Sequence, residues 1–464
     1  MKPERDQRLS DHVALGVLTS TFPPELVDEV VAVTGRVQQR SRLLPARLVV
    51  YYVLAMALFA QASYEEVMRS LVEGLSWASG WQRAWTVPTK AAIFRARSRL
   101  GAEPLVELFA RACVPLATES TPGAFYRGRR LVAVDGTCMD VADTADNAAV
   151  FGRPGTQRGE GVGAFPQVRL VALAECASHA ITAAAIGPVA SGESTLARGL
   201  LGALGPGMLV LADRGFTAHP LMSAAAATGA DLLWRAKGNA VLPVLDRHPD
   251  GSFRSEMVAS TDKRTRRDVL AVRVVEYAVD DPGRPHAAGT RYRLVTTILD
   301  PDQAPAGELA GLYAQRWEIE TALDELKTHQ RGPRVVLRSK TPDGVRQELY
   351  GHLCTHYAIR ALMHTAAHDR GVDPDRLSFT RSRDAARRSV RDGIGTVDTH
   401  LSAALDATVT EICAVLAPAT RRLRAAARVV KRKMSNYAVK RTHHRTWPQP
   451  TRAPTDTTLV LAPP

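Results

Sequence analysis

The sequence is poor in cysteine and has no long uninterrupted stretch of apolar residues. Its five cysteines are scattered over 464 residues and odd in number, so they predict reduced thiols rather than a disulfide framework or a zinc knuckle. No stretch reaches the roughly 18 apolar residues that span a bilayer. The charged N-terminus also lacks the apolar segment of a secretory signal. We therefore expect a cytoplasmic protein that does not act at a membrane.

Acidic residues are too few to balance the basic ones. The chain has 60 lysines and arginines against 47 acidic residues, a net charge of +13. Such an excess favours a polyanionic partner, and nucleic acid is the commonest polyanion in a cytosol. Residues 421–452 hold eleven basic residues and no acidic one, a composition suited to phosphate contacts. From this tail we select Lys431, Arg432 and Lys433 as expected DNA contacts.

The changing pattern of apolar residues predicts three regions. Residues 1–125 have helical periodicity and are expected to form an all-helical N-terminal domain. Residues 126–345 alternate strands and helices, which predicts a mixed α/β domain, with a β-rich insertion at about 238–305 where the period is close to two. Residues 346–464 are expected to be helical and to end in the basic tail.

The N-terminal region contains two short expected helices, at residues 63–75 and from residue 88 onward. The second is rich in basic residues, and the pair could form a helix-turn-helix that reads a major groove. A helical bundle with solvated arginines explains the same pattern equally well. The expected DNA contacts in this second helix are Lys90, Arg95, Arg97 and Arg99.

Three acidic residues occupy positions where ligands usually bind in α/β proteins. Asp135 is expected to end the strand at residues 131–135, and Asp213 ends the strand at residues 208–212. Glu320 lies in a long helix expected at residues 306–328. Carboxylates gathered at one edge of a sheet repel each other unless a cation lies between them. Mg²⁺ accepts a few carboxylates and leaves positions for phosphate oxygens, and two such ions can support phosphoryl transfer.

The expected helix around Glu320 has a regular set of functional side chains. Tyr313, Arg316, Glu320 and Lys327 are separated by three, four and seven positions. These spacings are close to one or two helical turns, so the four side chains share a face. The face could hold one metal ligand among groups that bind phosphate. A solvated helix with favourable charge pairs would show similar spacings.

The chain here resembles the bacterial insertion-sequence transposases grouped around insertion sequence four. Their signature is Tyr, two residues, Arg, three residues, Glu, six residues, Lys. Further matching segments are found around both aspartates and in the N-terminal region. The segments that match this family are Tyr313 to Lys327, Val134-Asp135-Gly136-Thr137, Leu211-Ala212-Asp213-Arg214-Gly215-Phe216, Leu44-Pro45-Ala46-Arg47 and Arg97-Ser98-Arg99-Leu100-Gly101.

This resemblance implies a ribonuclease H-like catalytic core with a β-rich insertion before the last catalytic helix. It implies a DDE transposase, which cleaves DNA and transfers strands in cut-and-paste transposition. Asp135, Asp213 and Glu320 would then be the catalytic metal ligands for two Mg²⁺ ions, with Mn²⁺ as a substitute and no organic cofactor. Tyr313, Arg316 and Lys327 would contact DNA phosphates, with Arg214 as a helper.

The same resemblance implies the partners and the location. The expected substrate is double-stranded DNA, at the terminal inverted repeats of an insertion sequence and at a target. A homodimer is expected in the synaptic complex, since each protomer handles one of two paired ends. The protein would be nucleoid-associated in the bacterial cytoplasm.

Two other functions use the same residues. A nuclease or resolvase would need the same three acids but would yield no joined products. A repressor descended from such an enzyme would bind DNA and is expected to have lost an acid, yet all three are present. The histidine pairs His352/His356 and His364/His368 have metal-ligand spacing, but their surroundings are typical of a buried core, so we do not assign zinc to them.

Overall fold

The computed structural model describes residues 16–38, 44–78, 87–155, 161, 163–259, 264–279, 291–333, 335–392, 398–417, 439, 441–442 and 458–462. The chain divides into two compact units. The first comprises Met1–Ala124, Gly136–Leu200 and Ile319–Leu416, and the second comprises Phe125–Asp135, Leu201–Glu318 and Ala417–Pro464. Both units are built from segments that are distant in the sequence. The three consecutive domains expected from the sequence remain a prediction.

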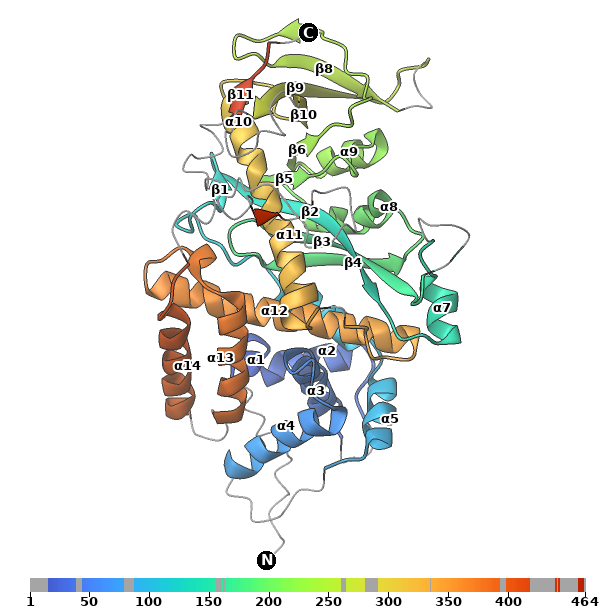
Figure 1. Cartoon of the computed structure of the whole chain (residues 1–464), viewed down its shortest axis with the longest axis vertical. Coiled ribbons are helices and arrows are strands. Elements are labelled where there is room, and N and C mark those ends of the chain that lie inside the picture. Colours follow the sequence, from blue (N-terminus) through green and yellow to red (C-terminus); the bar gives the residue numbers. More distant parts are fainter. Residues whose placement is uncertain are drawn as a thin grey trace, which may run out of the picture. The chain divides into compact units, whose positions relative to one another are not determined.

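The first unit is mainly helical (Figure 1). Its N-terminal helices are α1 (Val17–Thr21), α2 (Pro24–Val33), α3 (Ala46–Leu58), α4 (Tyr64–Ala78), α5 (Lys90–Leu100) and α6 (Glu103–Ala112). Its C-terminal helices are α12 (Pro342–Asp369), α13 (Phe379–Asp392) and α14 (Asp398–Cys413). The helical character expected for the N-terminal region is therefore confirmed. Among the described residues, no helix is both long and apolar enough to cross a bilayer.

Helices α3 and α12 form the centre of the first unit. Twelve of the thirteen residues of α3 are buried, which agrees with its nearly continuous apolar sequence. Helix α12 packs against α3, and the two backbones approach closely at Gly351. A Cβ atom at Gly351 would lie 2.7 Å from Val53 Cγ1 and 3.2 Å from the Val53 carbonyl oxygen. The missing side chain of Gly351 is thus what allows this helix pair to pack.

The first unit also contains a β-hairpin and two short helices. Strands β3 (Gln167–Glu175) and β4 (Ile181–Pro188) pair antiparallel, with Val171 opposite Ala185. Helix α8 (Glu193–Ala197) follows them. Helix α7 (Ala145–Phe151) precedes β3. Its signals are local, because Thr144 caps its N-terminus and Gly152, with φ +73°, follows its C-terminus.

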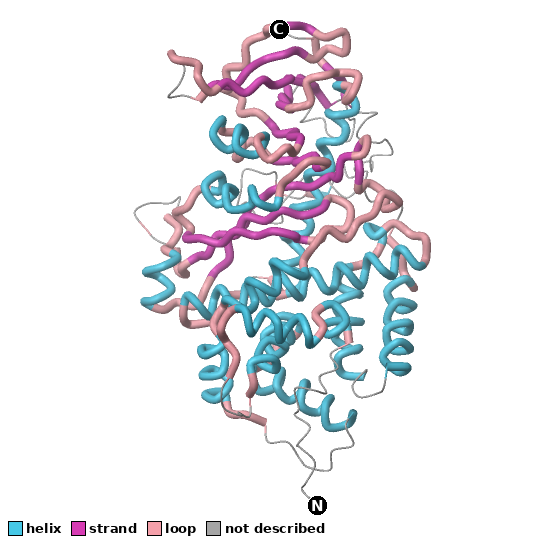
Figure 2. The backbone as a smooth tube through the Cα atoms, turned by 180° about the vertical axis from the view of Figure 1, so that it is seen from behind, coloured by secondary structure: helices cyan, strands magenta, loops and turns pink. Residues whose placement is uncertain are grey.

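The second unit is dominated by a β-sheet. Its strands are β1 (Phe125–Tyr126), β2 (Arg129–Asp140), β5 (Met208–Ala212), β6 (Asp231–Arg235), β7 (Asp246–Arg247), β8 (Phe253–Val258), β9 (Val269–Val279), β10 (Arg291–Thr296) and β11 (Thr458–Val460). The order across the sheet is β2-β5-β6-β10-β9-β8-β7, with β1 beside β2 and β11 beside β9. In Figure 2 the strands are the magenta segments of the backbone tube. Helix α9 (His219–Ala226) connects β5 to β6.

Strands β2, β5 and β6 are parallel, whereas the later strands pair antiparallel. In the parallel part, Val134 lies opposite Ala212, and Ala212 lies opposite Trp234. Strand β10 then pairs antiparallel with β6, so the β-rich segment extends this sheet. The expected mixed α/β character is confirmed.

One expected boundary is wrong. Asp135 does not end its strand, because β2 continues to Asp140. The residues of β2 from Gly136 on belong to the first unit. The parallel partner β5 does end at Ala212, directly before Asp213. The apolar run ends at Val134, and of the residues that follow it in β2 only Met139 is buried, so no apolar pattern indicates that the strand continues.

The last helical segment before α12 is continuous but not uniform. It begins with α10 (Ala306–Leu312), passes through a 3₁₀ turn (Tyr313–Arg316) and α11 (Trp317–Asp324), and ends in a π-helical turn (Glu325–Gln330). The long helix expected at residues 306–328 is therefore present with two local changes of winding. Residues up to Glu318 belong to the second unit and later ones to the first.

We predict that Gly351→Leu lowers the free energy of unfolding by about 1–3 kcal/mol or more, because overpacking forces side chains and backbone to shift. Gly202→Leu is the matched control, since no atom lies within 4 Å of a Cβ built there. Urea unfolding followed by circular dichroism measures both. Equal stability of the two variants would show that α3 and α12 are not in close contact at Gly351.

Candidate active site

The second unit brings two of the predicted acids together through the register of its parallel strands. Val134 and Ala212 are the last paired residues of β2 and β5. Asp135 and Asp213 directly follow them, and neighbouring strands lie about 4.8 Å apart. The two carboxylates are therefore neighbours at one end of the parallel sheet. Two adjacent negative charges of this kind repel each other and favour a shared cation.

Arg316 lies beside the first of these carboxylates. Its Nη1 is 3.6 Å from Asp135 Oδ2, and the arginine side chain is only 8% exposed. The guanidinium also lies 5.0 Å from the ring centroid of Trp317, where a cation is attracted to the aromatic face. Arg316 therefore places a buried positive charge next to Asp135.

Tyr313 holds the end of β5 from the 3₁₀ turn. Its buried hydroxyl donates a hydrogen bond to the carbonyl oxygen of Ala212, at 3.0 Å. Burial raises the pKa of Tyr313 above its ordinary value, so the phenol remains a neutral donor. Ala212 directly precedes Asp213, and therefore this bond fixes the backbone that presents the second carboxylate.

Asp213 is also held by its own turn. Its Oδ1 accepts a hydrogen bond of 2.7 Å from the backbone N–H of Gly215. A Cβ at Gly215 would lie only 2.9 Å from that oxygen, so the glycine leaves room for the turn. Arg214, between them, is exposed.

The first unit holds the other two predicted residues of the helical segment. Glu320 is half-buried in α11, and Lys327 is exposed in the π-helical turn. Lys327 Nζ donates a hydrogen bond to Thr137 Oγ1 at 3.4 Å. Thr137 is two residues after Asp135 in β2, and alternate residues of a strand share a face. Sequence reasoning missed Thr137, although this alternation was available as a signal.

The basic residues expected to contact DNA have different environments. Lys90, Arg95 and Arg99 are exposed on α5. Arg97 is buried, and its guanidinium donates hydrogen bonds to Gln347 Oε1 at 2.8 Å and to Ser339 Oγ at 3.0 Å. The burial of Arg97 argues against the DNA contact expected of it, because these protein groups occupy its donors.

The predicted contacts in the basic tail, Lys431, Arg432 and Lys433, lie outside the described residues.

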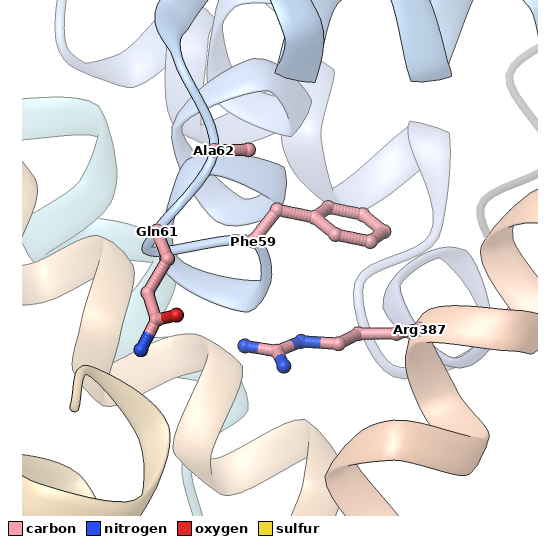
Figure 3. Close-up of a pocket in the computed structure, with 4 residues that line it drawn as sticks. All are labelled: Phe59, Gln61, Ala62 and Arg387. Carbon is pink, nitrogen blue, oxygen red and sulfur yellow. The ribbon is translucent and has the colours of Figure 1, made fainter.

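A hollow in the first unit does not contribute to this group of residues. It measures about 250 Å³ and is lined by Phe59, Gln61, Ala62 and Arg387 (Figure 3). Arg387 Nε donates a hydrogen bond of 2.7 Å to the carbonyl oxygen of Leu58. The lining has no carboxylate, so it offers no ligand set for a hard cation.

Family models match most of the chain. Residues 12–110 match the model described as "Insertion element 4 transposase N-terminal". Residues 126–357 match the model described as "Transposase DDE domain". The second match spans both aspartates and the whole helical segment from Tyr313 to Lys327.

Two relatives come from Escherichia coli (strain K12). The transposase InsG for insertion sequence element IS4 is 31% identical over 362 residues, which cover 77% of this chain and 79% of InsG. InsZ is 23% identical over 234 residues, covering 50% of this chain and 72% of InsZ. Among solved structures, a piggyBac transposase synaptic complex with hairpin DNA aligns over 84% of each chain, with 10% identity and a TM-score of 0.41. That score is too low to support an argument about this chain.

We predict that Tyr313→Phe lowers the free energy of unfolding by about 1 kcal/mol, because the buried Ala212 carbonyl loses its donor. The difference should shrink as the pH rises above about 10, the ordinary pKa of tyrosine. Since folding raises the pKa of Tyr313, its contribution is complete below that pH and is lost above it. Urea unfolding of both proteins at pH 8 and pH 10.5 measures the effect. A pH-independent difference would contradict the buried hydrogen bond.

Proposed function

Because the chain belongs to the transposase family of insertion sequence element IS4, we propose that it cuts and joins DNA at the terminal inverted repeats of its own insertion sequence. Transposition of DNA is the activity of this family, and its DDE domain implies dependence on a divalent metal ion.

We propose Asp135, Asp213 and Glu320 as the metal ligands. The neighbouring positions of the two aspartates support this, because their mutual repulsion is relieved by a cation. Three carboxylates are an oxygen donor set of the kind that Mg²⁺ prefers, and Mn²⁺ accepts the same ligands. The donor chemistry of these residues therefore fits divalent ions of this kind. When bound, divalent ions of this kind activate a nucleophile and stabilise the leaving oxygen of a phosphodiester.

The surrounding residues would orient the acids and the DNA. Arg316 holds Asp135 in place, and with Lys327 it provides positive charge for phosphate oxygens near the cut. Tyr313 is buried and bonded to Ala212, so we assign it a positioning role in place of the phosphate contact expected from the sequence. Arg214 is exposed next to Asp213 and remains a proposed phosphate contact.

The fold of the catalytic region is proposed to be ribonuclease H-like. The order of the elements along the chain supports this proposal. A long strand, β2, is followed by an antiparallel hairpin, β3 and β4, and then by β5 and β6, which run parallel to β2 and to each other. The antiparallel strands β7 to β10 then precede the helical segment that contains Glu320.

Double-stranded DNA is the proposed partner throughout. The exposed side chains of Lys90, Arg95 and Arg99 on α5 provide positive charge for it. We propose that two copies of the chain assemble on paired ends, because each end needs one set of catalytic acids. Binding to chromosomal DNA would make the protein nucleoid-associated.

The observation that supports this function most directly is the register of β2 and β5. Its test is an excision assay in Mg²⁺, with a marker flanked by the inverted repeats. We predict that Glu320→Gln reduces excision by several orders of magnitude while binding of the DNA ends survives, because glutamine keeps the shape but lacks the charge. Asp324→Asn is the matched control. It removes an exposed carboxylate one turn further along α11, paired with His329 on the surface, and should leave excision unchanged.

Each other result of this assay has a clear meaning. Equal excision by wild type and Glu320→Gln would place the metal ligands elsewhere. Cleaved ends without joined products would favour a nuclease or resolvase. End binding with no excision by the wild type would favour a repressor.

A separate prediction concerns the arginines of α5. Arg95→Ala and Arg99→Ala should weaken DNA binding and reduce its dependence on salt by about one counterion each. Arg97→Ala should instead lower the free energy of unfolding by about 2–3 kcal/mol, because its buried hydrogen-bond partners lose a charged donor. Fluorescence anisotropy at several salt concentrations and urea unfolding separate the two effects. Unchanged stability of Arg97→Ala would refute the buried network.

A further inference from the structure

A π-helical turn follows the helix that contains Glu320. It spans Glu325–Gln330 and includes Lys327. A π-turn has more residues per turn than an α-helix, so side chains beyond its start point in different directions from those of a straight α-helix. Such turns are rare and need outside support, since they are less stable than the α-helix they replace. The direction in which Lys327 points therefore depends on what holds this turn.

The first residue of the turn is bound by α12. Glu325 is 3% exposed, and Arg360 donates hydrogen bonds to both of its carboxylate oxygens. Arg360 Nε donates to Glu325 Oε2 at 2.9 Å, and Nη2 donates to Oε1. His356, one turn earlier in α12, places Nε2 3.4 Å from Glu325 Oε2. The start of the π-turn is thus fixed to two residues of one helix.

A second element supports Arg360 from its other side. Arg360 Nη2 is hydrogen-bonded to Nδ1 of His179, in the turn between β3 and β4. The Nε2 atom of His179 lies 3.2 Å from Oδ1 of the buried Asp375. His179 has a positive φ of 57°, an uncommon conformation for this residue type. The surrounding bonds hold it there, so the network joins the π-turn, α12, the β3–β4 turn and the segment that contains Asp375.

The last residue of the turn is fixed as well. Gln330 is buried, and its Nε2 donates a hydrogen bond of 3.1 Å to the carbonyl oxygen of His352 in α12. Lys327 is exposed between these two buried ends and donates to Thr137 Oγ1. The arrangement is a clamp: both ends of the turn are tied to α12, and the lysine projects from its middle.

From this geometry we infer that Glu325 is a positioning residue that acts through Lys327, holding the π-turn in the form that presents the lysine ammonium to a DNA phosphate. This inference rests on the proposed function of Lys327 at the catalytic site. Glu325 itself is buried and touches no substrate. Its role is to anchor the π-turn to α12, so that the ammonium group of Lys327 keeps one direction.

The charge of Glu325 is essential to this role. Burial alone would raise its pKa, but Arg360 and the two histidines hold the pKa well below the usual range. The carboxylate therefore stays ionised. An ionised group this deeply buried is stable only with its partners in place, because an unpaired buried charge is very costly. The clamp is consequently stiff, since any movement of the turn breaks charged hydrogen bonds.

A double-mutant cycle between Glu325 and Lys327 tests the inference. The rate of cleavage at the inverted repeats is measured in Mg²⁺ for Glu325→Gln, Lys327→Ala and the double variant. We expect Glu325→Gln to slow cleavage about tenfold in the wild-type background and less than about twofold in the Lys327→Ala background, because coupled residues give non-additive effects. Additive effects in the two backgrounds would overturn the inference.

Two controls separate positioning from loss of stability. Glu276→Gln removes a similarly buried carboxylate of β9, paired with Arg291 and Arg293, and should affect stability without coupling to Lys327. Arg360→Lys keeps the positive charge but loses the bidentate hydrogen bond to Glu325. It replaces Glu325→Gln in the cycle if that variant folds poorly, and it should show the same coupling to Lys327. Urea unfolding of each variant confirms that rates are measured on folded protein.

Failure of this inference is distinguishable from failure of the proposed site. Glu320→Gln is included in the same assay. If Glu320→Gln cleaves normally, the proposed catalytic site is wrong. If Glu320→Gln is inactive and Glu325 does not couple to Lys327, only the positioning role of Glu325 is wrong.

Discussion

The parallel pairing of β2 with β5 is the constraint on which the rest of the site depends. It places two carboxylates next to each other, since Asp135 and Asp213 follow the paired residues Val134 and Ala212. Backbone hydrogen bonds between buried strands hold this register, because a slip by one residue would move every apolar side chain to the wrong face. The adjacent positions of the two acids are therefore built into the sheet, and Arg316 lies beside the first of them.

The helical segment from Ala306 to Gln330 supplies those groups, and its irregular winding has a function at each end. The 3₁₀ turn presents Tyr313 to the backbone of β5 and Arg316 to the first carboxylate. The π-turn presents Lys327 to Thr137 of β2. A uniform α-helix would direct these side chains differently. The departures from ideal helix geometry thus coincide with the residues proposed to act on DNA.

The sequence predicts those features that local patterns determine. The strand at residues 208–212 was predicted with its bounds because a short apolar run between Gly207 and Asp213 is typical of a buried strand. The continuation of β2 past Asp135 was missed, since Gly136 and Thr137 gave no apolar signal. The π-turn could not be predicted, because the residues that contact its first carboxylate, His356 and Arg360, are distant in the sequence.

Arginine is the residue type for which sequence and structure differ most. Arg97 was expected to contact DNA together with Arg95 and Arg99, but it is buried and donates hydrogen bonds to the neutral side chains of Gln347 in α12 and Ser339 in the loop before it. Arg360 and Arg316 are likewise buried and bound to carboxylates. A net charge of +13 therefore overstates what is available to DNA phosphates. The buried arginines are bound to carboxylates or neutral groups of the protein, and the exposed ones remain to bind DNA. The contribution of the exposed arginines should therefore weaken as the salt concentration rises, while that of the buried ones should change little.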